Sequence, residues 1–224
     1  MTVEKIQGIL AVLQKDLILE LRSKYAINTV LAFVGSSLLL VIFSLKAQVL
    51  PPTPRSGLVW IIILFASLSS LSRSFVLETE RNTFDLLRIH ADPNSVLLGK
   101  FFYNFFFTLM VNVVTMTAYI YLLGISVQDW LILLLTVLLG TVGLAAISTL
   151  LAAIVSQASR KGAIFSVLSI PLLVPLDLLL VNTTKAALAS GKVPGVWNDI
   201  TALIGFAGVM LTASIMLFEY IWED

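Results

Sequence analysis

Cysteine is absent from this chain of 224 residues, and charge is scarce. Without cysteine the chain can form no disulfide, no thiolate metal site and no C-x-x-C-H haem attachment. Only 12% of the residues are charged, against about 25% in an ordinary soluble domain, and 58% are hydrophobic. So few charges cannot cover a water-facing surface. A disordered chain needs high charge and low hydrophobicity, which is the reverse of this composition. These shortages exclude a soluble globule and predict an integral membrane protein.

Long charge-free runs are abundant, and a helix needs roughly 20 apolar residues to cross the hydrocarbon layer. Six runs predict six transmembrane helices: Tyr25–Leu45, Ser56–Ser72, Phe101–Gln128, Trp130–Ser159, Gly162–Leu176 and Ile200–Phe218. The second run is short unless Arg73 snorkels to the headgroups, and the fifth continues to Thr184 if Asp177 is tolerated. No room is left for a soluble domain, so residues 1–224 are predicted to form one all-α membrane domain.

The orientation follows from the short loops, because Lys and Arg are retained on the cytoplasmic side. One side collects most of them: Lys5, Lys15, Arg22, Lys24, Arg73, Arg81, Arg88, Lys100, Arg160 and Lys161. The other side has only Lys46, Arg55, Lys185 and Lys192. Both termini are therefore predicted to be cytoplasmic. The net charge of +1 argues against a polyanionic partner, so we expect no nucleic acid.

The N-terminal segment, residues 3–22, is predicted to be an amphipathic helix lying in the cytoplasmic membrane interface. Its apolar residues recur at helical spacing: Ile6, Leu10, Leu13, Leu17 and Leu21. Asp16 and Glu20 lie near the edge of this stripe and fit it poorly. The alternative is a cytoplasmic extension of the first transmembrane helix.

The loop of residues 78–93 carries a short helical pattern. Asn82 followed by Asp85 resembles a helix start, and Pro93 disfavours helical geometry at Asp92. Phe84 and Leu87 would share one face of this helix. A short amphipathic helix must bury that face, either against lipid headgroups or in a groove of a cytoplasmic partner. The alternative is a solvated charged loop.

Several segments together resemble one known family. The run from Glu78 to Lys100, which ends in Leu97-Leu98-Gly99-Lys100, looks like the coupling loop of type-2 ABC exporter permeases. More specifically, residues 15–188 resemble the haem exporter protein B family (CcmB) of cytochrome c maturation. The segments that carry this resemblance are Lys15-Asp16-Leu17, Glu20-Leu21-Arg22, Leu68-Ser69-Ser70-Leu71, Leu139-Gly140-Thr141, Lys161-Gly162 and Ser169-Ile170-Pro171-Leu172-Leu173-Val174-Pro175-Leu176.

The resemblance implies a permease subunit in the bacterial cytoplasmic (inner) membrane. It would pair with an ABC ATPase subunit (CcmA-like), which uses the ATP, and work beside a haem-handling membrane protein (CcmC-like) and a haem chaperone (CcmE-like). A second copy of the chain is expected, because six spans with one coupling loop suit half of a transporter. Haem is implied as cargo, and no cofactor is assigned to this chain itself. The residues implied to dock on the ATPase are Glu78, Glu80, Asp85, Leu86, Leu87 and Arg88, with Arg160 and Lys161 in a smaller second contact.

The chain carries no nucleotide-binding motif, because Gly99-Lys100 is followed by Phe101 and lacks the earlier glycine of a phosphate-binding loop. The sequence contains no Ser-His-Asp set and no paired acids suited to catalysis, and its single histidine, His90, lies in the predicted loop. We therefore expect no catalytic and no metal-ligating residues, and ATP hydrolysis must come from another chain.

Two features of the fifth run are further candidates. Pro171 and Pro175 each remove a backbone donor, which predicts a kinked or broken helix that serves either a hinge or packing. Asp177 is an acid within a predicted span, and the family resemblance would place an apolar residue there. An acid at that depth is a functional candidate by default, although it could also reach the outer water.

Two other functions stay open on the sequence alone. The first is a non-transporting scaffold, in which ATP hydrolysis by the partner remodels a haem-chaperone complex and nothing crosses through these helices. The second is an ion-coupled secondary transporter, which would need a buried ionisable relay and usually inverted repeats. Asp177 is the only sequence feature that supports the second function.

Overall fold

The computed structural model describes residues 2–45, 50–71, 92–156, 161–191 and 193–223. All regular secondary structure within these ranges is helical. The helices are α1 (Thr2–Ser23), α2 (Tyr25–Leu45), α3 (Pro52–Leu71), α6 (Pro93–Leu122), α7 (Trp130–Ser156), α8 (Lys161–Leu188) and α9 (Val196–Glu223).

The helices have the length and composition of membrane spans. In the described part of the chain, five helices are long and apolar enough to cross a membrane, and α3 supplies a shorter apolar helix over Pro52–Leu68. The bounds of α2 coincide with the predicted run, and α7 begins at Trp130 as predicted. Helices α6 and α8 extend beyond the predicted runs, because α6 begins at Pro93 instead of Phe101 and α8 continues to Leu188, past both Leu176 and Thr184. The all-helical membrane fold predicted from the sequence is therefore confirmed.

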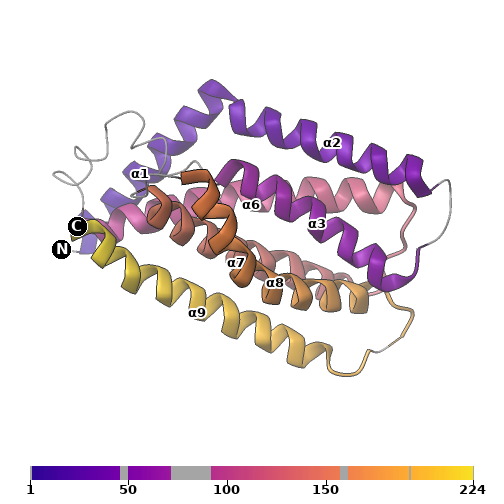
Figure 1. Ribbon diagram of the computed structural model, residues 1–224. Coiled ribbons are helices and arrows are strands. Elements are labelled where there is room, and N and C mark those ends of the chain that lie inside the picture. Colours follow the sequence, from indigo (N-terminus) through magenta and orange to yellow (C-terminus); the bar gives the residue numbers. More distant parts are fainter. Residues whose placement is uncertain (1, 46–49, 72–91, 157–160, 192, 224) are drawn as a thin grey trace.

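The bundle is built around α7, which packs against α6, α8 and α9. Figure 1 shows α2 and α9 on opposite sides of the bundle, with α3, α6, α7 and α8 between them. Both chain termini lie at one end, which we call the terminal end, and α6 starts there. The segments that join α6 to α7 and α8 to α9 lie at the other end, the far end.

Close packing around α7 depends on residues without large side chains. A Cβ atom on Gly140 would lie 2.8 Å from Leu180 Cδ2 and 2.9 Å from Trp60 Cη2. A Cβ atom on Gly143 would lie 2.9 Å from Leu176 Cδ1. Small residues allow membrane helices to approach closely, and the resulting van der Waals contacts replace the hydrophobic driving force that is lost in lipid. The glycines of α7 therefore position α3 and α8.

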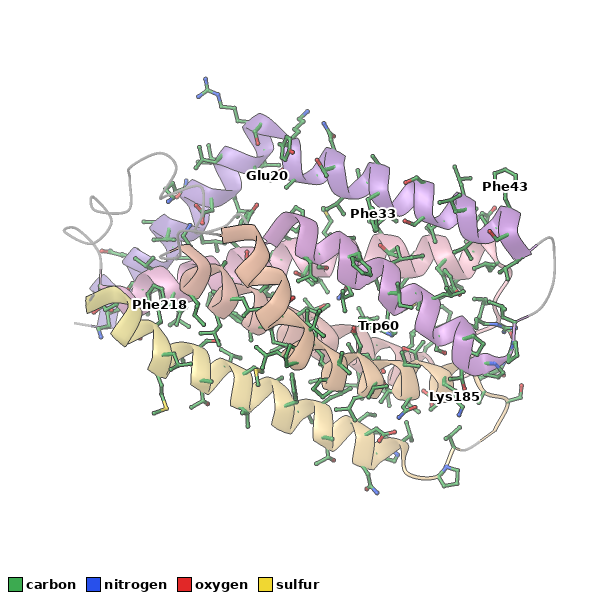
Figure 2. The ribbon with its side chains drawn as sticks, viewed as in Figure 1. Glu20, Phe33, Phe43, Trp60, Lys185 and Phe218 are labelled. Atoms are coloured by element: carbon green, nitrogen blue, oxygen red, sulfur yellow. The ribbon has the colours of Figure 1, made fainter. Side chains whose placement is uncertain are left out.

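Hydrogen bonds tie α3 to its neighbours toward the far end. The indole Nε1 of Trp60 donates to Thr184 Oγ1 of α8 at 2.8 Å, and Tyr119 of α6 donates through its hydroxyl to the carbonyl of Arg55 at 2.8 Å. Trp60 lies in the middle of the bundle in Figure 2 and is 1% exposed. These bonds satisfy polar groups that would otherwise be buried without partners.

Candidate functional site at the α1–α6 junction

The first turn of α6 is anchored at the residue where the loop 78–93 ends. Asp92 is extended (φ −67°, ψ 135°) and is the N-cap, with its carboxylate accepting from the backbone N–H of Ser95 at 3.4 Å. Pro93 takes the first helical position, where its missing N–H costs nothing. The predicted non-helical geometry of Asp92 is confirmed.

A buried ion pair joins α1 to α6. The Nζ atom of Lys100 lies 3.1 Å from Asp16 Oδ2, and the Lys100 side chain is 1% exposed. Lys15 Nζ lies 3.3 Å from the other carboxylate oxygen, Oδ1. A charge this deeply buried is expensive unless it is paired, so α1 supplies a partner that α6 needs. The sequence analysis counted Lys100 as a loop cation, whereas the structure places it inside α6.

The two helices also approach closely at small residues. A Cβ atom on Gly99 would lie 2.7 Å from Val12 Cβ and 3.0 Å from the carbonyl oxygen of Ile9. A Cβ atom on Gly8 would lie 3.2 Å from Ser95 Cβ. Val12 belongs to a small apolar cluster at this end of the bundle, which also contains Val96, Leu97, Ala152, Ala153 and Phe218. Figure 2 shows Phe218 of α9 near the terminal end.

The connection between α1 and α2 is a defined corner. Lys24 has a positive φ of 53°, which ends α1, and Glu20 Oε1 accepts from the backbone N–H of Ile27 at 3.0 Å in the first turn of α2. Figure 2 shows Glu20 at this corner, where the two helices change direction. α1 is therefore a separate helix and not a straight extension of α2.

The exposed face of α1 retains part of the predicted apolar stripe. Ile6, Leu10 and Leu21 are exposed, while Val12 and Asp16 are buried against the rest of the protein. The poor fit of Asp16 to the stripe has a physical cause, because that residue belongs to the opposite, protein-facing side of the helix. The exposed apolar side chains are available to lipid, as an interfacial helix requires.

The residues implied to dock on an ATPase lie almost entirely outside the described residues. This holds for Glu78, Glu80, Asp85, Leu86, Leu87, Arg88 and Arg160. Lys161 is the first residue of α8, and its side chain is not among those described. The docking role of all these residues stays a prediction.

Pro171 and Pro175 both lie inside α8, which is helical from Lys161 to Leu188, so the helix is not interrupted at the prolines. The predicted kink stays a prediction. Prolines are tolerated within membrane helices where neighbouring groups satisfy the freed backbone carbonyls. Asp177, on the same helix, is partly buried, and its Oδ1 atom has no hydrogen-bond partner in the described part of the chain. Its role stays open.

Sequence reasoning missed the pairing of Asp16 with Lys100. A signal existed, because the segments Lys15-Asp16-Leu17 and Gly99-Lys100, both used for the family resemblance, meet in space. Within the described ranges no group of three or more histidine or acidic side chains could hold a metal ion. The junction brings the amphipathic helix α1 into contact with the membrane helix α6.

The fold and this junction define a helical protein of the multi-pass membrane class. Comparison with known proteins narrows the class. The family model described as "CcmB protein" matches residues 7–220, and the chain therefore belongs to the CcmB family.

Three curated relatives called "Heme exporter protein B" are similar to it. The protein from Rhodobacter capsulatus is 31% identical over 167 residues, covering 74% of this chain and 77% of the relative. That from Haemophilus influenzae is 26% identical, covering 66% and 70%. That from Pseudomonas aeruginosa is 28% identical, covering 61% of each. The resemblance found in the sequence is confirmed.

Proposed function

We propose that this chain is the permease subunit of an ABC transporter that serves haem delivery in cytochrome c maturation at the bacterial inner membrane. Membership of the CcmB family over residues 7–220 is the observation that carries this proposal. The relatives' name, "Heme exporter protein B", supports haem as the cargo or as the group handled by the complex.

The proposed topology has six crossings with both termini in the cytoplasm. The five long apolar helices and the shorter α3 supply the crossings, and the two termini lie at the same end, as an even number of crossings requires. The excess of Lys and Arg at that end in the sequence supports a cytoplasmic location for it. α1 then lies at the cytoplasmic interface, with its exposed apolar side chains toward lipid.

In the proposed mechanism, a separate ATPase supplies the energy and residues 78–93 receive it. The sequence lacks a G-x-x-x-x-G-K-[ST] motif, so ATP hydrolysis belongs to another chain. The loop leads directly into the capped first turn of α6, and the Asp16–Lys100 pair binds α1 to the same helix. A push on the loop would therefore move α1 and α6 as one body. The ATPase can shift the helices only if it binds their two arrangements with unequal affinity.

The proposed complex contains two copies of this chain and two ATPase (CcmA-like) subunits. A haem-handling membrane protein (CcmC-like) and a haem chaperone (CcmE-like) would complete it.

Replacing Asp85 and Leu87 together with alanine tests the coupling loop. We expect this double variant to lose co-purification of the ATPase from native membranes, because the charged and apolar contacts of the loop would both be removed. Asp199→Ala with Ile204→Ala, at the far end on α9, is the matched control and should retain the ATPase. A normal ATPase complex in the Asp85/Leu87 variant would overturn the assignment of the loop.

The export role and the scaffold role can be distinguished by following haem in proteoliposomes that contain the whole complex. ATP-dependent accumulation of haem on the side opposite to the ATPase supports export through these helices. Release of the haem chaperone on ATP hydrolysis without such accumulation would replace the export role with the scaffold role.

A further inference from the structure

A continuous stripe of polar side chains runs along one face of α6 inside the bundle. The spacing of four, four, four, three and four residues keeps them on one side of a helix, and a span of 19 residues rises about 28 Å. All of these residues are buried: Lys100, Asn104, Thr108, Asn112, Thr115 and Tyr119. At one end of the stripe Lys100 donates to Asp16, and at the other end the Tyr119 hydroxyl donates to the carbonyl of Arg55.

The two asparagines bind α7 in the same way. Asn104 Nδ2 donates to Thr149 Oγ1 at 2.7 Å, and the Thr149 hydroxyl donates to the carbonyl of Ala145 at 2.6 Å. Asn112 Nδ2 donates to Thr141 Oγ1 at 2.8 Å, and the Thr141 hydroxyl donates to the carbonyl of Val137 at 2.7 Å. The two asparagines are eight residues apart on α6, and their threonine partners are eight residues apart on α7. Equal spacing is what two antiparallel helices in constant register require.

These contacts fix the orientation of both amides. Each threonine hydroxyl has one proton, and it is already donated to a backbone carbonyl, so the hydroxyl can only accept from the asparagine. The amide nitrogen must therefore face α7, and the amide oxygen faces away. The Oδ1 atoms of Asn104 and Asn112 are buried and have no hydrogen-bond partner in the described part of the chain.

The two threonines of the stripe behave differently from three threonines of α7, α8 and α9. The hydroxyls of Thr136, Thr183 and Thr201 each donate to the carbonyl four residues back in their own helix. Those of Thr108 and Thr115 are fully buried and have no partner among the described residues. Both are therefore free to bind a further group along the stripe.

Ser67 of α3 adds a fifth oxygen of the same kind, and α3 packs against α6. It lies 12 residues beyond Arg55, and Thr108 lies 11 residues before Tyr119, so the Arg55–Tyr119 bond places Ser67 and Thr108 at similar depth. Ser67 is therefore a further buried oxygen at the depth of the middle of the stripe, on a helix that packs against α6.

We propose that the middle of this stripe, from Asn104 to Thr115, binds a row of buried water molecules. Amide oxygens can only accept hydrogen bonds, so the ligand must be a small donor, and hydroxyls suit one that both donates and accepts. A monovalent cation would also suit these oxygens, but in the described part of the chain the one carboxylate bonded to the stripe, Asp16, is already paired with Lys100. An uncompensated buried charge is far more costly than bound water, which typically makes about three hydrogen bonds in such sites.

Bound water would also give α6 and α7 partners that can be exchanged when the helices shift. The site itself does not depend on the proposed function.

Valine substitutions test the proposal, because valine keeps the shape of threonine and removes the hydroxyl. Thr108→Val and Thr115→Val should each lower the midpoint of unfolding in bicelles more than Thr136→Val does. The control removes a hydroxyl that bonds only within its own helix. If the hydroxyls bind nothing, their removal relieves a buried unpaired group, and an equal or higher midpoint would overturn the proposal.

A density map of the protein in lipid nanodiscs, at a resolution that shows ordered water, gives an independent test. We expect peaks about 3 Å from Asn104 Oδ1 and Asn112 Oδ1, with equal strength in sodium and in caesium buffers. A peak that strengthens in caesium would identify a cation site instead of water and overturn the proposal. The lack of any peak at both oxygens would also overturn it.

Discussion

Replacing Asp16 with alanine removes the carboxylate that lies 3.1 Å from the Nζ atom of Lys100 and 3.3 Å from that of Lys15. Lys100 is 1% exposed, so water cannot take over the role of the carboxylate without opening the contact between α1 and α6. Removing one partner of a buried ion pair costs about 3–5 kcal/mol, or roughly two to four orders of magnitude in an equilibrium constant. We expect this cost to appear as undocking of α1.

Lys100→Met should cost less than Asp16→Ala. Asp16 retains Lys15 as a cationic partner when Lys100 is replaced, and the long apolar side chain of methionine fills the buried space. A double variant, Asp16→Leu with Lys100→Met, should recover most of the lost stability, because an apolar pair of similar volume often replaces a buried ion pair without loss.

Hydrogen exchange of the α1 backbone amides in nanodiscs measures this undocking. Asp16→Ala should accelerate exchange in α1 while leaving α7 protected, and the double variant should restore slow exchange. Asp199→Ala, an acid outside the junction, is the control. Unchanged exchange of α1 in Asp16→Ala would refute the claim that the ion pair holds the two helices together.

Two further substitutions test the packing around the junction and around α7. Gly99→Ala should destabilise the α1–α6 contact by about 1–3 kcal/mol in an unfolding titration, because the added Cβ would lie 2.7 Å from Val12 Cβ, whereas Gly35→Ala, with nothing within 4 Å, should not. Trp60→Phe should lower stability by about 1–3 kcal/mol, because it leaves the Thr184 hydroxyl without its 2.8 Å donor. In a double-mutant cycle, Thr184→Val should then add little to Trp60→Phe, and strictly additive losses would contradict the bond.

The spans of this protein were predictable because length and hydrophobicity decide them. Tyr25–Leu45 and the start of α7 at Trp130 follow directly from the ends of charge-free runs. α6 was predicted to start too late because Lys100 reads as a loop residue when it is taken alone. Its burial depends on Asp16, which lies 84 residues earlier, and no local pattern reports a contact of that separation.

The polar stripe was hidden for a similar reason. Asn104 lies within a run of aromatic residues, which reads as an apolar or interfacial segment. Only the helical spacing from Asn104 to Thr115, taken together with Thr149 and Thr141 of α7, reveals a polar face inside the bundle. A search for polar residues at intervals of three and four within predicted spans could have found it.

Photo-crosslinking from residue 84 in native membranes tests the central claim most directly. A photoreactive amino acid at Phe84 should capture a nucleotide-hydrolysing protein. The same probe at Tyr121, which is 83% exposed at the far end of the bundle, should not. Capture from position 84 alone would support ATP-driven coupling through this loop. Failure to capture any ATPase from position 84, in membranes where the intact complex is present, would contradict it.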